Sequence, residues 1–343
     1  MRAIQYSRTG DPDVLTMVDR PITEPAPGEV RIRVYRSGVN PTDWKSRRGS
    51  GSTGSGGGRV DPPQVPGQDG AGVVDAVGSG VDAALVGGRV WVWEAAFRRT
   101  EGTTQEFALV PAGQVVPLPG SVSFDLGASL GIPFLTAHRC LTVTEDGPTV
   151  LGPGTLQDRV VLVAGGAGAV GNAAIQLARW CDATVISTVS GPAKAQLAVA
   201  AGADHVIDYR RQDVVAEIRK LAPHGVHTIV EVSPANAAID AAVIARHGSV
   251  AIYANNGGDD VTVPVPSQMV PNSRWQFVLV YTAPREAKAR AVDDVAAAVA
   301  SGAVRVGEGA GLPIHHYPLD QAAQAHAAVE DAIVGKVLID VTA

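Results

Sequence analysis

The chain has 343 residues, of which 45% are hydrophobic and 18% are charged, and its formal net charge at pH 7 is −6. This length and apolar content are enough for two domains with their own cores. The acidic balance disfavours a surface that binds nucleic acid or an anionic membrane, and no apolar run reaches the length of a membrane span.

Residues 1–125 are expected to be rich in short β-strands, beginning with a strand pattern in residues 1–6. Alternating apolar and polar residues predict a half-buried strand at 30–36. Apolar runs bounded by glycine or proline predict further strands at 70–78, 88–93, 106–110 and 115–119. Short strands punctuated in this way favour a compact, barrel-like domain.

Residues 49–59 are almost entirely glycine and serine. Such a segment predicts a flexible loop that cannot pack a core. It is either a surface loop without a specific role or a mobile lid beside an active site.

After residue 126 the pattern changes, first to a turn at 127–133 and a helix at 134–141. Strands are then predicted at 160–164, 183–188, 205–207, 226–232 and 249–253, alternating with helices at 172–179, 194–201, 214–221 and 236–244. This alternation predicts an α/β fold with a doubly wound parallel sheet.

The pattern changes again near residue 273. A strand is predicted at 274–281, helices at 286–301 and 319–334, and a last strand at 336–341. We therefore expect residues 1–126 and 273–343 to form one domain, into which the dinucleotide-binding domain of residues 127–272 is inserted. The strand at 274–281 is apolar on both faces and would be an aggregation hazard at an open sheet edge, so we expect it to pair with its copy in a homodimer.

A glycine motif follows the predicted strand at 160–164. It reads Gly166-Ala167-Gly168-Ala169-Val170-Gly171, with the spacing G-x-G-x-x-G, and a helix pattern begins directly after it. In a dinucleotide-binding unit the first glycine allows a tight turn, the second lets the backbone approach the phosphates, and the third lets the helix pack on the strand. The alternative is a glycine-rich turn of some other α/β protein.

The next strand indicates which dinucleotide is bound. NAD-specific sheets place an acid near the end of this strand, where it accepts a hydrogen bond from the ribose 2′-hydroxyl. Here the strand ends at 187–190 without an acid, and Asp182 precedes it. The missing carboxylate leaves room for a 2′-phosphate, so NADPH is predicted over NADH.

Two cysteines, Cys140 and Cys181, occur in the chain, and neither has a C-x-x-C partner. Both lie in helix-like contexts and are interpreted as reduced, buried residues. Because no signal peptide is recognised, we expect a cytoplasmic protein.

Several motifs together resemble one family. They are residues 37–43, 66–72, 87–90, 136–137, the glycine motif, 202–209 and 335–337. In these the chain resembles the medium-chain dehydrogenase/reductase superfamily, and within it the zinc-free quinone oxidoreductase (zeta-crystallin-like) branch. The resemblance implies a β-rich, GroES-like barrel domain beside the nucleotide-binding domain, an active site in the cleft between them, and NADPH-dependent reduction of quinones or other α,β-unsaturated carbonyls.

Two other functions stay open. One is an enoyl or ketone reductase of the same superfamily, and the other is a non-enzymatic NADPH-binding protein with a structural, sensing or RNA-binding role.

Zinc-dependent relatives carry Cys where this chain has Asn40, and a His-Glu pair where it has Gln68-Asp69. Amide groups are poor zinc ligands, so we expect no metal site. The pairs His224/His227 and His315/His316 are interpreted as surface polar residues.

The resemblance also implies roles for single residues. Asn40 is either a hydrogen-bond donor to the developing oxyanion or the residue that holds the turn before Pro41. Asp43 either orients its neighbours and carries protons or forms an Asx-type turn. A tyrosine common in the branch aligns with Lys45, which puts a tyrosine proton donor in doubt.

Cofactor and substrate contacts follow from the same resemblance. Lys194, with Ser190 and Tyr209, is assigned to the 2′-phosphate, the alternative being that Lys194 is an ordinary exposed helix lysine. Arg210 either reaches the same anion or lies exposed. Further cofactor contacts are assigned to Tyr253, Asn255 and Lys336. Walls for a flat substrate are assigned to Trp44, Trp93 and Phe97, each of which is otherwise a core residue.

Overall fold

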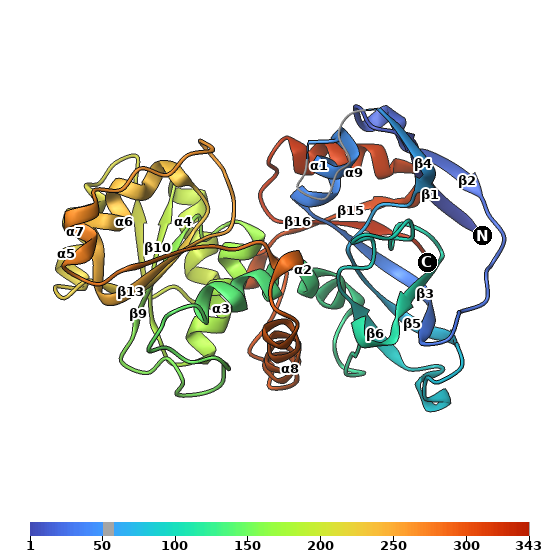
Figure 1. Ribbon diagram of the computed structural model, residues 1–343, viewed down its shortest axis with the longest axis horizontal. Helices are drawn as coiled ribbons and strands as arrows, with labels where there is room; N and C mark the ends of the chain where they lie inside the picture. The colour runs from blue at the N-terminus through green and yellow to red at the C-terminus, as the bar shows by residue number, and fades with distance from the viewer. Residues whose placement is uncertain (51–57, 343) are drawn as a thin grey trace. The chain divides into compact units, whose positions relative to one another are not determined.

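The computed structural model describes residues 1–50 and 58–342, and the chain divides into two units. Unit 1 comprises Met1–Ile132 and Ile314–Ala343, and unit 2 comprises Pro133–Pro313. The chain first leaves unit 1 inside helix α2 (Phe124–Leu141). Residues 51–57, the centre of the predicted flexible loop, lie outside the described residues. Figure 1 traces the chain by colour from end to end.

Unit 1 is built on two β-sheets. A three-stranded sheet has the order β2-β1-β4, and a seven-stranded sheet has the order β15-β16-β3-β5-β6-β8, with β7 paired to β3. The strands are β1 (Arg2–Arg8), β2 (Thr16–Asp19), β3 (Glu29–Val39), β4 (Arg59–Gln64), β5 (Asp69–Val77), β6 (Arg89–Val92), β7 (Phe107–Pro111), β8 (Val115–Pro117), β15 (Ile314–Pro318) and β16 (Lys336–Asp340). Because β16 pairs antiparallel with β3, the last strand of the chain completes the first domain, as the sequence predicts for both chain ends.

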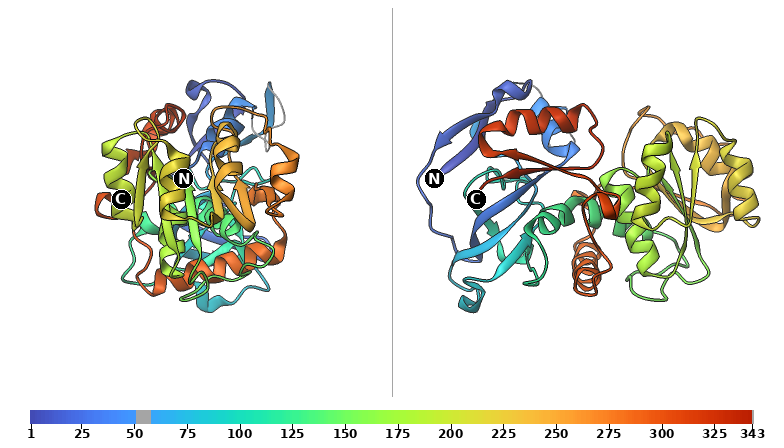
Figure 2. Two further views of the ribbon diagram at one scale, coloured as in Figure 1. Left: turned by 90° about the vertical axis from the view of Figure 1, so that its left-hand side faces the viewer. Right: turned by 180° about the vertical axis from the view of Figure 1, so that it is seen from behind.

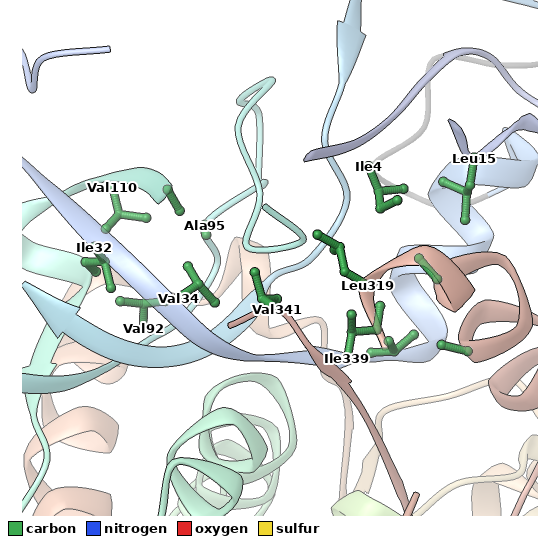
Figure 3. Close-up of a cluster of buried hydrophobic side chains, with 14 of the residues drawn as sticks. Ile4, Leu15, Ile32, Val34, Val92, Ala95, Val110, Leu319, Ile339 and Val341 are labelled. Carbon is green, nitrogen blue, oxygen red and sulfur yellow. The ribbon is translucent and has the colours of Figure 1, made fainter. Parts of the chain in front are cut away.

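The core of unit 1 unites residues from both ends of the chain. Figure 3 shows Ile4 and Ile32 in one buried cluster with Leu319 and Ile339. Each such buried aliphatic side chain stabilises the fold by about 1.5–3 kcal/mol. Helix α9 (Ala322–Glu330) contacts α1 (Pro41–Arg48), β15 and β16 (Figure 1), so the helix that carries Asn40 at its N-cap is packed by the C-terminal segment.

Unit 2 contains a six-stranded parallel sheet of order β11-β10-β9-β12-β13-β14. Its strands are β9 (Val160–Ala164), β10 (Thr184–Val189), β11 (His205–Asp208), β12 (Val226–Glu231), β13 (Ile244–Ile252) and β14 (Arg274–Phe277). Numbered from β9, this is the order 3-2-1-4-5-6 of doubly wound dinucleotide-binding sheets. The predicted α/β sheet is therefore confirmed.

Helices lie on both sides of this sheet (Figures 1 and 2). The helices of unit 2 that follow β9 are α3 (Ala169–Trp180), α4 (Pro192–Ala201), α5 (Val214–Leu221), α6 (Ala237–Val243), α7 (Val265–Met269) and α8 (Arg285–Ala300). Helix α3 contacts α4, β9 and β10, whereas α5 contacts α6 and β11. Among the described residues, no helix combines the length and apolarity needed to span a bilayer.

Two segments differ from the sequence-based expectations. Residues 127–133 are not a turn but part of α2, because Gly127 and Gly131 serve close packing: a Cβ on Gly131 would lie 2.0 Å from Asp69 Oδ1. Residues 273–313 belong to unit 2 rather than to the domain formed by the chain ends. The reason is that β14 pairs with β13 and extends the parallel sheet. The predicted strand at 274–281 ends at Phe277.

Candidate functional site

The glycine motif forms the turn between β9 and α3. A Cβ on Gly171 would lie 2.4 Å from Gly165 O, so only glycine permits the helix to approach the turn this closely. The residue of this turn with left-handed backbone is Gly165, which precedes the motif and has φ +70. Gly166 is required for a different reason, since its Cβ would lie 2.1 Å from Ser187 Oγ on the neighbouring strand β10.

The N-terminus of α3 offers space and donors for an anion. Gly168 is the N-cap and is exposed, and a Cβ there would find its nearest atom, Gly165 O, only at 3.4 Å. The first N–H groups of a helix lack intrahelical acceptors and carry the positive end of the helix dipole. With Ala167, Ala169 and Val170 between the glycines, this turn fits a dinucleotide pyrophosphate.

Three predicted phosphate-binding residues lie at the ends of neighbouring strands. Ser190 follows β10, Lys194 lies in the first turn of α4, and Tyr209 follows β11, with its N–H donating to Val189 O at 3.1 Å. Tyr209 is 51% exposed. Within the described chain Lys194 makes no ion pair.

The carboxylates near these strands are engaged elsewhere. Asp208, the last residue of β11, accepts from Arg210 N at 3.1 Å. Asp182 precedes β10, as expected, and accepts from Gly154 N at 2.8 Å. Arg210, which is exposed, and Lys194, which is half-buried, are cationic side chains that follow β11 and β10.

Tyr253 and Asn255 follow β13 in the same unit. The N–H of Tyr253 donates to Glu231 O at 3.0 Å, and burial raises the pKa of the Tyr253 phenol, which stays protonated. Asn255 is exposed and its Nδ2 donates to Asp259 at 2.7 Å. Glu231, which the sequence analysis missed, ends β12 and accepts from Ser233 N and Asn236 Nδ2. Burial raises the pKa of Glu231 and of its neighbour Asp240.

Unit 1 holds a buried polar cluster formed by Asn40, Asp43, Asp69 and Lys336, each of which is at most 3% exposed. Lys336 Nζ donates to Asn40 Oδ1 at 2.8 Å and lies 3.6 Å from Asp69 Oδ2. Asn40 Nδ2 donates to Asp69 Oδ2 at 2.7 Å. The amide of Asn40 is thus held from both sides.

The backbone completes this cluster. Asp43 Oδ2 accepts from Asn40 N at 2.7 Å, which caps α1, and Asp69 Oδ1 accepts from Ile132 N at 2.9 Å. Gly38 pairs with Leu338, and a Cβ on Gly38 would lie 3.1 Å from Lys336 Cε. The nearest atom to such a Cβ would be Ala128 O, at 2.1 Å, so glycine at this position permits the close approach of α2 and leaves room for the lysine.

Burial shifts the pKa values of all three ionisable groups toward their neutral forms. Burial raises the pKa of Asp43 to about 7, and the nearby charge of Asp69 contributes. Burial likewise raises the pKa of Asp69 and lowers that of Lys336, while their mutual attraction opposes both shifts. With Asp43 protonated, the Asp69 carboxylate and the Lys336 ammonium make the cluster electrically neutral.

The aromatic residues assigned to the substrate lie on different elements. Trp44 is half-buried on α1, Trp93 is buried directly after β6, and Phe97 is half-buried four residues later. Lys45 Nζ lies 5.8 Å from the centre of the Trp44 ring, and Arg98 lies 5.2 Å from that of Phe97. Their contact with a substrate stays a prediction.

The two cysteines and three of the histidines have environments typical of residues that support the fold. Cys140 and Cys181 are buried and free. His227 Nδ1 accepts from Val160 N, His315 Nε2 lies 2.9 Å from Val334 O, and His316 Nδ1 lies 2.8 Å from Asp340. In the described part of the chain, no group of three or more His, Cys, Asp or Glu side chains could hold a metal ion.

Comparisons with known proteins agree with this architecture. Residues 26–120 match the family model of the alcohol dehydrogenase GroES-like domain, and residues 169–297 match that of the zinc-binding dehydrogenases. The quinone oxidoreductase of Lama guanicoe is 30% identical over 329 residues, which cover 95% of this chain and 92% of that relative.

Solved structures give the same result. The Escherichia coli quinone oxidoreductase complexed with NADPH is 26% identical, with a TM-score of 0.79 over 99% of this chain and 100% of that chain. An NAD-dependent alcohol dehydrogenase is 27% identical, with a TM-score of 0.84 over 100% of both chains. On these sequence and structural matches, the chain belongs to the quinone oxidoreductase branch of the medium-chain dehydrogenase/reductase superfamily.

Proposed function

We propose that this protein is an NADPH-dependent oxidoreductase that reduces quinones or other α,β-unsaturated carbonyls by hydride transfer without zinc. The Lama guanicoe relative and the NADPH-bound Escherichia coli structure support the quinone and the cofactor. The observation that carries the proposal is the amide of Asn40, fixed between Lys336 and Asp69 at the position where zinc-dependent relatives carry a ligand.

The donor set at this position does not fit zinc, although one matched family model is named for zinc binding. Thiolate, imidazole and carboxylate are the usual ligands. Here Asn40 Oδ1 already accepts from an ammonium group, and that buried positive charge would repel a metal cation. We therefore derive no step through a metal.

The residues of unit 2 fit NADPH. The N-terminus of α3 would bind the pyrophosphate, and Ser190, Lys194 and Tyr209 would bind the 2′-phosphate. When bound, NADPH supplies a hydride. Further contacts from Tyr253 and Asn255 remain part of the proposal.

The residues of unit 1 would stabilise the charge that the hydride leaves on the substrate. The Nδ2 of Asn40 has two hydrogens, of which one is donated to Asp69, and the other would be donated to the developing oxyanion. Asp43, whose pKa is about 7, would supply the proton that completes the reduction.

The test is a substrate panel with purified protein. We expect NADPH oxidation with ortho- and para-quinones, activity that EDTA leaves intact, and no stoichiometric zinc by metal analysis. Robust oxidation of simple alcohols with NADP⁺, or one zinc per chain, would contradict the proposal. The panel includes enones and simple ketones, so turnover of these alone would favour an enoyl or ketone reductase.

We also infer that the protein forms a homodimer through β14. This strand lies at an edge of the parallel sheet, and Phe277, at its end, is 65% exposed. Met269, the last residue of α7, and Val270 are exposed as well. Pairing of β14 with its copy would cover the open edge. A monomeric mass by light scattering at micromolar concentration would refute it. The two buried free cysteines are compatible with a cytoplasmic location.

A further inference from the structure

A cavity of about 290 Å³ opens beside Asp43 within unit 1. Its described walls come from β1, from α1, from the end of β4 and from residues 96–100, which follow β6. A single water molecule occupies about 30 Å³ of liquid, so the cavity has room for a substituent of a substrate. The polar groups of the wall indicate the chemistry of that substituent.

Two polar side chains of the wall have donors that lack acceptors. The hydroxyl of Tyr6 donates to Gln64 Oε1 at 2.9 Å, and the Nε2 of Gln64 donates to none of the described residues. The carbonyl of Thr100 accepts from Val65 N, whereas its hydroxyl has no partner in the described part of the chain. The unpaired acceptor Gln68 Oε1 has less than 1 Å² of accessible surface and is not within reach of a ligand. These groups therefore favour a ligand that accepts hydrogen bonds.

Two arginines supply positive charge to the wall. Arg99 Nη2 is paired with Glu29 at 2.7 Å, whereas Arg98 is exposed and makes no ion pair with the described residues. Burial raises the pKa of Tyr6 to about 12 and that of Asp43 to about 7, so both groups are mainly neutral at about pH 6. Among the described residues of the wall, the charge of Arg98 therefore has no matching carboxylate.

The backbone holds Arg98 in an uncommon conformation. Its φ is +57, in the left-handed region that costs a residue other than glycine about 1–2 kcal/mol. A turn fixes the preceding residue, because Phe97 N donates to Glu94 O at 3.1 Å. The guanidinium of Arg98 lies 5.2 Å from the centre of the Phe97 ring, a predicted wall for a flat substrate. An anion bound by Arg98 would thus lie close to that ring.

We propose that this cavity is a substrate subsite for a carboxylate, so that the protein prefers quinones with an anionic substituent and Arg98 determines the preference. The inference rests on the proposed quinone reduction and adds the class of substituent. A carboxylate has two acceptor oxygens with about four lone-pair positions. It would accept from the guanidinium of Arg98 and from the unpaired donors of Gln64 and Thr100, and the charged pair gives the stronger hydrogen bonds.

The experiment compares 1,4-benzoquinone-2-acetate with 1,4-benzoquinone-2-acetamide, which are equal in size and differ in charge. NADPH is the reductant, and an assay at about pH 6 leaves the acetate ionised, because a carboxylic acid has a pKa near about 4. The measured quantity is the ratio of kcat/KM for the acetate to kcat/KM for the acetamide. We expect this ratio to be about fivefold higher in wild type than in Arg98→Met, the effect of one exposed charge pair. Comparing the two proteins removes the intrinsic difference in reactivity between the quinones.

The variant Arg33→Met is the matched control. Arg33 is exposed on β3, and its guanidinium lies 5.7 Å from the centre of the Tyr35 ring, so this variant also loses one positive charge and one ring contact. Arg33 is not among the described residues that line the cavity, and we expect the ratio of wild type. A ratio that is unchanged in Arg98→Met, or that falls equally in Arg33→Met, would overturn the subsite.

A binding measurement separates this inference from the proposed function. Calorimetry with the hydroquinones 2,5-dihydroxyphenylacetate and 2,5-dihydroxyphenylacetamide requires no turnover. We expect Arg98→Met to raise the Kd of the acetate about fivefold relative to that of the acetamide. If neither quinone is reduced but this binding difference is found, the proposed reaction fails and the subsite stands. If both quinones are reduced and Arg98→Met changes neither the kcat/KM ratio nor the relative Kd, the subsite fails and the reaction stands.

Discussion

The two units use lysine in opposite ways. Lys336 of unit 1 is 2% exposed and its ammonium contacts Asn40 and Asp69. Lys194 of unit 2 is only half-buried and has no ion pair within the described residues. The buried charge is part of the fold and is costly to disturb, whereas the charge of Lys194 is not held by an ion pair of the described residues and is available to a ligand.

The largest expected effect is that of Lys336→Met. Removing the ammonium leaves the buried Asp69 without its positive partner, and breaking a buried ion pair costs about 3–5 kcal/mol. Urea unfolding should show this loss. Lys220→Met, at a side chain that is 67% exposed, should change the free energy of unfolding by less than about 0.5 kcal/mol. Adding Asp69→Asn should restore part of the loss, and equal losses in the two lysine variants would show that Lys336 is not a structural charge.

The second effect is a pH dependence. Folding raises the pKa of Asp43 from its ordinary value near 4 to about 7, so between these values the folded state binds more protons than the unfolded state. The contribution of the Asp43 carboxyl group to the free energy of unfolding therefore falls as pH rises from 4 to 7. The free energy of unfolding of Asp43→Asn, taken relative to that of wild type, should therefore rise by up to about 4 kcal/mol between pH 4 and pH 8.

Unfolding of both proteins by urea across this range measures that gain. Asp19→Asn, at an exposed position on β2, is the control and should run parallel to wild type. A constant difference between Asp43→Asn and wild type would mean that Asp43 does not titrate near neutral pH.

The variant Lys194→Ala tests the predicted binding site for the 2′-phosphate in unit 2. Losing one charge-assisted hydrogen bond should raise the Kd for NADPH about tenfold to a hundredfold and leave the Kd for NADH nearly unchanged. The free energy of unfolding without cofactor should stay within about 0.5 kcal/mol of wild type. Equal responses of the two cofactors, or a wild-type preference for NADH, would refute this assignment of the 2′-phosphate.

The smallest effects separate two glycines of the same turn. Gly171→Ala places a Cβ 2.4 Å from a backbone oxygen, whereas Gly168→Ala meets nothing closer than 3.4 Å. We expect Gly171→Ala to lower the melting temperature through overpacking worth about 1–3 kcal/mol. Gly168→Ala should melt like wild type and bind NADPH more weakly. If Gly171→Ala melts unchanged, the close approach of helix and turn is not needed for stability.

The parallel sheet of unit 2 could be predicted because its signals are local. Each strand from β9 to β12 is an apolar run followed by a helix pattern, and the glycine motif marks the end of the first. The same kind of local pattern predicts a turn at 127–133, but in the structure the glycines and the proline of this segment lie inside α2. Glycine there serves contact with Asp69, a requirement that a local pattern cannot express.

Long-range partners could not be predicted. Asn40 and Asp43 were found from one motif, but the pairing of Asp69 with Lys336 joins residues 267 positions apart (336 minus 69). The unpaired oxygen of Gln68 is a property of the packed cavity wall and has no sequence signal. Likewise, the position of residues 273–313 depended on which strand β14 pairs with.

Because the end of the chain belongs to unit 1, this unit can be completed only late in protein synthesis. Residues 1–132 leave the ribosome 204 positions before Lys336 (336 minus 132), a delay of about 10 to 40 seconds at 5–20 residues per second. Throughout that interval Asn40 and Asp69 have no ammonium partner, and β3 lacks its neighbour β16. While the inserted domain is synthesised, the first domain therefore remains incomplete, because β3 lacks one neighbouring strand and Asp69 lacks its positive partner.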